Sequence, residues 1–276
     1  MALWKIEDVI PESNIICVSP HYDDFLFFLG GYVLELKSRG LLDTKRFTNI
    51  STMSRSNYQE GDEDGNKDRS LPRVQHVIGI RIIEDLECLD ELLGQHNYNY
   101  RVMGEEESLV RGKGMDGGEG EMEMSFGSYE SMEQCDWDIL DRMEACIAKL
   151  ALRDDTAIVL PLSMKGHIDH FVVREAGVRA YQRPGRKAAF YFAEDKPYAG
   201  IMTDEESAVS DEFISKYDLT DRVFPGHPHE LLRLAHKHYP SQVNPVYDEG
   251  VHNRTEQLKQ LFQTDKPCDR IFTFKD

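Results

Sequence analysis

Two short clusters of histidine and aspartate, in residues 19–24 and 167–170, each follow a run of apolar residues typical of a buried strand. The apolar runs cover 15–18 and 157–162, and behind each cluster apolar residues recur at the spacing of a helix. The sequence therefore predicts the same strand–turn–helix unit twice. In an open α/β sheet such turns lie outside the carboxyl ends of the strands, where ligands bind, so the two turns can face each other across one site.

The rest of the chain also alternates between predicted strands and helices. This alternation favours an α/β fold with a Rossmann-like, mostly parallel sheet flanked by helices, and with a less regular C-terminal part beyond about residue 200. We expect a single domain over 1–276, because no linker or internal repeat divides the sequence. Further strands are predicted at 47–53, 97–103, 187–193 and 270–274, and helices at 26–39, 71–93, 136–152, 171–180, 204–216, 227–239 and 255–263.

Two polar stretches interrupt this pattern. Residues 54–70 are rich in Gly and Asp and are predicted to form a loop at the end of the second strand. Residues 104–134 are acidic, contain seven glycines and have almost no aliphatic side chains. This composition predicts a flexible insertion or a lid over a site.

Charge and composition argue against several classes of function. The formal net charge of −18 disfavours binding to a nucleic-acid backbone, which requires clustered Lys and Arg. No apolar run approaches the roughly 18 residues of a membrane span, and the first residues lack the pattern of a secretory signal. The five cysteines are scattered, without a Cys-x-x-Cys pair, which favours reduced thiols. We therefore expect a cytoplasmic protein with a small-molecule substrate, and leave open whether it forms a homo-oligomer.

The residue types in the two clusters suit a metal-dependent hydrolase. His21 and Asp24 are three residues apart across the first turn and can reach one ion, and a histidine of the second turn can join them. Two histidines and one carboxylate leave a coordination position open, which is typical of a catalytic zinc. A single His or Asp before a helix is most often a helix cap, so this hypothesis depends on the two clusters together.

Both clusters also resemble the sequence boxes of one enzyme family. Residues 19–25, Ser-Pro-His-Tyr-Asp-Asp-Phe, resemble the Pro-His-Pro-Asp-Asp-Glu box of the PIG-L (LmbE-like) zinc-dependent de-N-acetylases. Residues 167–170, His-Ile-Asp-His, resemble the His-x-Asp-His box of that family. Weaker similarity follows in family order at 81–84, 191–199 and 239–242, so the resemblance extends over most of the chain.

The resemblance implies one Zn²⁺ per chain, or another divalent metal in its place, with His21, Asp24 and His170 as ligands. It implies that a zinc-bound water removes an N-acetyl or related acyl group from an amino sugar, such as an N-acetylglucosamine derivative, or from a similar small amide. Asp23 is then the general base. His167 is expected to stabilise the oxyanion or to protonate the leaving amine.

Three further residues are expected to support this site. Asp169 is a candidate to orient one of the histidines through its second ring nitrogen. Arg55, after the second strand, and Arg81, in the helix 71–93, are candidates for contacts with substrate. The alternative for Arg55 is a solvated loop, and the alternative for Arg81 is an ion pair with Glu84 on the helix surface.

Two residues depart from the family pattern. Tyr22 stands where the family has proline, and Phe25 stands where it has glutamate. The missing carboxylate leaves a non-catalytic binding protein of the same fold as an alternative. A further alternative is a non-haem iron enzyme, because two histidines and one carboxylate also suit iron.

Overall fold

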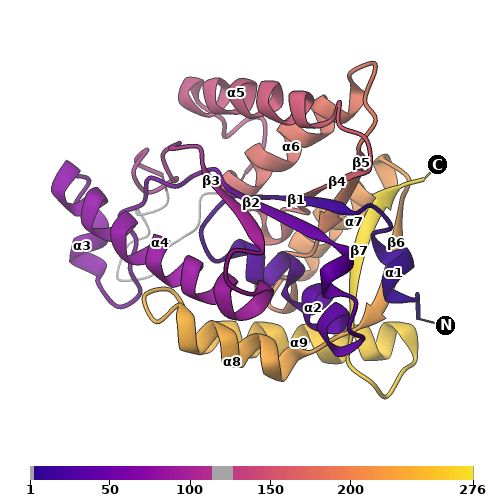
Figure 1. Ribbon diagram of the computed structural model, residues 1–276. Coiled ribbons are helices and arrows are strands. Elements are labelled where there is room, and N and C mark those ends of the chain that lie inside the picture. Colours follow the sequence, from indigo (N-terminus) through magenta and orange to yellow (C-terminus); the bar gives the residue numbers. More distant parts are fainter. Residues whose placement is uncertain (1–2, 114–126, 276) are drawn as a thin grey trace.

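The computed structural model describes residues 3–113 and 127–275, which form a seven-stranded sheet covered by helices on both faces (Figure 1). The strand order is β3-β2-β1-β4-β5-β7-β6; the first five strands are parallel, and β7 is antiparallel to both of its neighbours. The predicted Rossmann-like, mostly parallel sheet is thus confirmed. The strands are β1 (Asn14–Ser19), β2 (Arg46–Ser51), β3 (Tyr98–Val102), β4 (Thr156–Pro161), β5 (Ala189–Ala193), β6 (Leu219–Pro225) and β7 (Cys268–Phe274).

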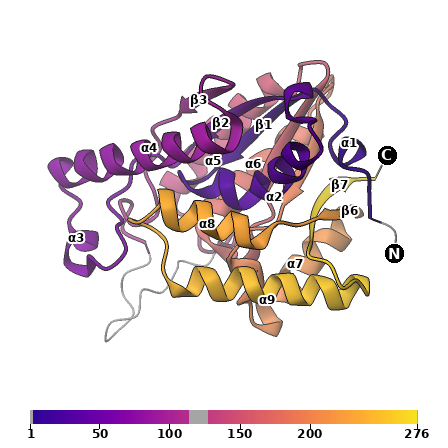
Figure 2. The same ribbon diagram turned by 60° about the horizontal axis from the view of Figure 1, so that its bottom comes forward.

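The helices form one layer on each side of the sheet (Figures 1 and 2). Helices α5, α6 and α7 contribute to the apolar core on one face, and α2, α4 and α8 to the core on the other face. The helices are α1 (Ile6–Val9), α2 (Asp24–Ser38), α3 (Glu63–Lys67), α4 (Leu71–Leu93), α5 (Gln134–Leu150), α6 (Ile168–Gln182), α7 (Asp204–Lys216), α8 (Pro228–His238) and α9 (Pro245–Phe262), with 3-10 turns at Leu42–Thr44, Met164–Gly166 and Tyr198–Gly200.

Strand β1 shows why the central strands are apolar at successive positions. Ile15 and Cys17 belong to the core beneath α2, whereas Ile16 and Val18 belong to the core beneath α6. Side chains alternate between the two faces and both faces are covered, so every one of these positions leaves water. Burial of one such large apolar side chain contributes about 1.5–3 kcal/mol.

Pairing of β1 with β4 brings the two polar clusters together. The strands are parallel and in register from the Asn14–Thr156 pair to the Cys17–Val159 pair, while β2 pairs with the other edge of β1. Strands β2 and β3 therefore lie on one side of β1, and β4 and β5 on the other. The β1–β4 boundary is the topological switch point at which α/β sheets bind ligands, and both clusters follow its strands.

The sequence pattern does not predict α1, β6 or the first part of α9. Strand β6 pairs only with β7 at the sheet edge among the described residues, and its three successive polar residues, 220–222, are exposed or partly buried and break its apolar alternation. Helix α9 contains Gly250, where an added Cβ would lie 2.3 Å from the carbonyl oxygen of Pro197. This close approach of α9 fixes the segment that carries Lys196 and Pro197.

Two further expectations concern segments and membranes. The stretch 54–70, predicted as a loop, contains the short helix α3. Of the predicted insertion or lid at 104–134, residues 114–126 lie outside the described part of the chain. Among the helices described, none is long and apolar enough to cross a membrane.

Candidate metal centre and active site

Three donor atoms from the two clusters converge at the carboxyl ends of β1 and β4. His21 Nδ1 lies 3.2 Å from His170 Nε2 and 3.4 Å from Asp24 Oδ2, and the last two atoms are 3.5 Å apart. Ligand atoms at about 2.0–2.1 Å from a tetrahedral metal are separated by about 3.3 Å. The triangle therefore has the size of one face of a tetrahedral zinc-type site. His167 lies near this triangle: one ring nitrogen each of His21, His167 and His170 lie within 4.8 Å of one another.

The turn after β1 holds the first two donors in place. The main-chain N–H of His21 donates to Asp24 Oδ2 over 2.6 Å, which closes the turn at the start of α2. Tyr22 is buried, and its hydroxyl donates to the carbonyl of Ser54. This tyrosine therefore anchors the turn in the place where the family has proline.

Two carboxylates fix which ring nitrogens face the metal position. Asp195, at the end of β5, forms a short hydrogen bond with His170 Nδ1. Asp169 Oδ2 lies 3.0 Å from His21 Nε2. Because an ionised carboxylate only accepts, each histidine donates through the nitrogen it presents to its aspartate, and its other ring nitrogen is the one that faces the cluster of donor atoms. The structure thus brings Asp169 to His21, in the arrangement predicted for an orienting group.

Asp169 is embedded in a buried polar network. It accepts hydrogen bonds from Arg111 Nη2 at 2.7 Å and from the main-chain N–H of Ser108 at 2.9 Å. Burial acts to raise the pKa of Asp169, but Arg111 and His21 outweigh burial and hold this pKa well below its usual value. The carboxylate therefore stays ionised. Arg111 also pairs with Asp136 over 3.0 Å, which ties the segment after β3 to α5.

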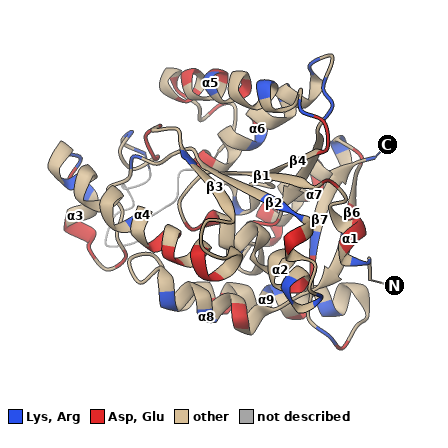
Figure 3. Cartoon of the chain, in the orientation of Figure 1, with Lys and Arg blue, Asp and Glu red and all other residues tan. Residues whose placement is uncertain are grey.

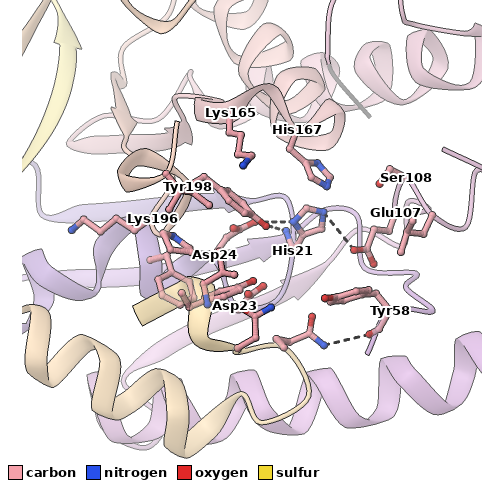
Figure 4. A pocket seen from close by; sticks show the side chains of 18 of the residues that line it. His21, Asp23, Asp24, Tyr58, Glu107, Ser108, Lys165, His167, Lys196 and Tyr198 are labelled. Carbon is pink, nitrogen blue, oxygen red and sulfur yellow. Dashed lines mark hydrogen bonds and ion pairs between the residues drawn. The ribbon is translucent and has the colours of Figure 1, made fainter. Parts of the chain in front are cut away.

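His167 lies at the N-terminus of α6 with a defined tautomer. The main-chain N–H of Asp169 donates to His167 Nδ1 over 3.1 Å, so the ring proton is on Nε2. Burial lowers the pKa of His167 to about 3. At neutral pH the ring is a neutral donor. Figure 4 shows it beside His21 at the cavity wall, and the two ring centroids are 5.0 Å apart.

Asp23 and Arg81 form a second charged group next to the donors. Arg81 Nη2 lies 3.3 Å from Asp23 Oδ1, while Nη1 lies 3.2 Å from Glu107 Oε2 and 2.8 Å from Ser56 Oγ. Burial raises the pKa of Asp23, although Arg81 opposes this shift. Arg81 therefore lies in the site, and Glu84, the partner in the alternative reading, instead accepts from Ser241 over 2.6 Å.

Arg55 lies apart from this group. Its side chain is about half exposed and pairs with Glu106 over 3.1 Å. It is not among the residues that line the cavity described next, so the structure gives no contact that supports its predicted role.

A cavity of about 560 Å³ opens beside the donors (Figure 4). This volume is in the range of small-ligand sites, and the wall combines charged groups with aromatic rings, as such sites usually do. The lining residues beyond the predicted ones include Phe27, Tyr58, Tyr198, Tyr247, Gln242 and Asn244.

Several residues of the site are absent from the sequence prediction. Lys165 lies between β4 and His167, and Asp195 and Lys196 lie within the stretch 191–199. Their position next to the sequence boxes was the signal that could have indicated them. Glu107 follows β3 in a stretch without periodicity, and no sequence signal singles it out.

Phe25 points away from the site. Its side chain is fully buried in the apolar core, with its ring 6.1 Å from that of Phe47, and it does not line the cavity. Position 25 thus serves the packing of α2, and all three donor atoms converge without a carboxylate there.

Comparisons with known proteins show which folds the chain resembles. No family model matches the sequence, and no curated protein does. Among solved structures, the zinc-inhibited form of teicoplanin deacetylase has a TM-score of 0.65 at 17% identity, covering 95% of this chain and 99% of that chain. The A40926 pseudoaglycone deacetylase has a TM-score of 0.59 at 17% identity, and the match covers 95% of this chain and 97% of that chain. The N,N'-diacetylchitobiose deacetylase of Pyrococcus horikoshii has a TM-score of 0.52 at 11% identity, and the match covers 97% of this chain and 86% of that chain. The chain therefore has the fold of these deacetylases, as the resemblance implies.

Proposed function

We propose that this chain is a metal-dependent de-N-acetylase of the PIG-L (LmbE-like) type, which hydrolyses the amide of an N-acetylated amino sugar or a similar small amide. The observation that carries the proposal is the triangle of His21 Nδ1, Asp24 Oδ2 and His170 Nε2, with sides of 3.2–3.5 Å, beside the carboxylate of Asp23, which pairs with Arg81 and lines the cavity. The shared fold with solved deacetylases supports it.

The donor set fits a divalent metal with an open coordination position. His21, Asp24 and His170 would hold the ion, and Asp169 and Asp195 would keep the two imidazoles in the ligating tautomer. A bound divalent metal supplies Lewis acidity, which lowers the pKa of a coordinated water and polarises an amide carbonyl.

Asp23 is the proposed general base. Asp23 lies in the same turn as His21 and Asp24 and lines the cavity. Its carboxylate pairs with Arg81, which Glu107 holds in place. Its raised pKa brings it closer to neutral pH, where a carboxylate accepts a proton from water more readily.

His167 is the proposed oxyanion donor. Its Nδ1 is occupied by the main-chain N–H of Asp169, so its Nε2–H is the group available to the cavity. Because the ring is neutral, it can donate a hydrogen bond to a developing negative charge. Of the two roles expected for His167, this geometry favours stabilisation of the oxyanion.

The direct test is acetate release from N-acetylglucosamine derivatives by protein reconstituted with different divalent metals. We expect activity that depends on added metal and falls by at least about 100-fold in Asp23→Asn, while metal content stays at about one ion per chain. The matched control is Asp64→Asn, because Asp64 is fully exposed. Undiminished hydrolysis by Asp23→Asn would contradict the proposal.

Metal identity needs its own titration. One structural neighbour was solved as a zinc-inhibited form, so excess zinc is a separate arm of the experiment. Zinc at about one ion per chain is the expected active form. Oxygen-dependent turnover with iron would instead support the non-haem alternative. The alternative of a non-catalytic binding protein rests on Phe25, whose side chain packs in the core and leaves the three donor atoms in place.

A further inference from the structure

Lys165 is the one cation lining the described cavity for which the structure shows no ionic partner. The other two cations of the wall are engaged: Arg81 with Asp23 and Glu107, and Lys196 with Asp269 over 2.7 Å. Figure 4 shows Lys165 on the same segment as His167, directed into the cavity. No carboxylate of the described residues lies within ion-pairing distance of its ammonium group.

The backbone at Lys165 adopts a conformation that lysine rarely takes. Its φ is 59° and that of Ser163 is 61°, both in the left-handed region. For a residue other than Gly or Asn this region costs about 1–2 kcal/mol, and such strain concentrates at functional sites. The segment is held by the main-chain N–H of Met164, which donates to Asp195 Oδ2 over 2.9 Å. The carboxylate that orients His170 therefore also fixes the turn that directs Lys165.

An unpaired ammonium group in a cavity favours an anionic ligand. The chain as a whole carries −18, so its average field repels anions, and a bound anion needs a local cation. Lys and Arg alternate with Asp and Glu along the described chain (Figure 3). The cavity itself provides the cation, beside the proposed reaction centre.

We infer that Lys165 binds an anionic substituent of the substrate, a carboxylate or a phosphate carried by the same molecule as the acylated amine. This inference rests on the proposed function for the identity of the reaction, but the binding of the anion does not require turnover. Lys165 is thus a specificity-determining residue, and the preferred substrate is an anionic derivative of an N-acetylated amino sugar.

The test measures binding of amine products to the metal-loaded protein by calorimetry. The probes are glucosamine, glucosamine 1-phosphate, glucosamine 6-phosphate and 2-amino-2-deoxyglucuronate, so the arms separate phosphate from carboxylate. We expect at least one anionic probe to bind about 10- to 100-fold more tightly than glucosamine, the range of one charge-assisted hydrogen bond. Equal affinity for all four probes would overturn the inference.

Two variants make the assignment specific. Lys165→Asn removes the charge and tolerates the left-handed backbone, so it is expected to fold and to lose the preference for the anionic probe. Lys165→Arg keeps the charge and is expected to retain the preference. A loss of affinity by Lys165→Asn that is equal for neutral and anionic probes would also overturn the inference. Absence of acetate release from every N-acetylated substrate would refute the proposed function alone, because the binding measurement stands without it.

Discussion

His170 and Asp195 form a short, fully buried hydrogen bond that links the second cluster to the end of β5. Through its other oxygen Asp195 accepts the N–H of Met164, so one carboxylate fixes both a proposed metal ligand and the turn before His167. Burial acts to raise the pKa of Asp195, and His170 opposes this shift. The pair therefore links the proposed metal site to the cavity wall.

Asp195→Asn should weaken metal binding by about 10- to 100-fold, because an amide cannot support the imidazole as a carboxylate does. The measurement is competition with a chromophoric chelator at fixed pH. Asp154→Asn is the matched control, since the Asp154 side chain is 80% exposed. An unchanged metal affinity in Asp195→Asn would contradict the role assigned to this pair.

Arg111→Met should both destabilise the protein and weaken the metal site. The substitution leaves the buried carboxylates of Asp136 and Asp169 without their shared guanidinium, and removing one partner of a buried ion pair typically costs about 3–5 kcal/mol. Urea unfolding reports the first effect and chelator competition the second. Arg142→Met is a suitable control because Arg142, which pairs with Glu105, is half exposed. If stability falls while metal affinity of the folded protein is unchanged, Asp169 does not need Arg111 to orient His21.

Phe25→Ala should lower the free energy of unfolding by about 3–5 kcal/mol, because it opens a cavity in the core beneath α2. Metal stoichiometry of the folded protein should stay unchanged, since Phe25 does not reach the donors. Thermal unfolding and metal analysis on the same sample measure both. A loss of metal without a loss of stability would mean that position 25 acts on the site after all.

The sequence predicts those parts of the fold and the site that depend on local patterns, and it does not predict those that depend on tertiary packing. The two clusters were predictable because strand, turn and helix periodicity locate them locally, and the parallel β1–β4 pairing then brings His21 and His170 together. Glu107 and Arg111 were not, because their contacts with Arg81 and Asp169 are made by an irregular segment whose path depends on tertiary packing. Local rules also give no indication that Phe25, which follows Asp24 directly, faces the core.

Asp85 should make the stability of the protein depend on pH between about 4 and 7. This carboxyl group is fully buried in α4, accepts hydrogen bonds from the hydroxyls of Tyr100 and Tyr239, both at 2.7 Å, and has no cationic partner among the described residues. Burial raises its pKa to about 7, although the two hydroxyls oppose the shift.

The sign follows from proton binding. Between the unfolded pKa of about 3.9 and the folded value of about 7, the folded state holds a proton on Asp85 that the unfolded state has lost. The contribution of Asp85 to the free energy of unfolding is therefore fully present below the unfolded pKa. It declines as pH rises, by up to about 1.4 kcal/mol per pH unit, until the group ionises in the folded protein. Asp85→Asn removes this titration. The free energy of unfolding is measured with urea for the wild type and for each variant. We expect the wild-type value minus the Asp85→Asn value to fall as pH increases from 5 to 7, whereas the wild-type value minus the Asp64→Asn value stays constant. A pH-independent difference for Asp85→Asn would show that Asp85 is already ionised in the folded protein at pH 5.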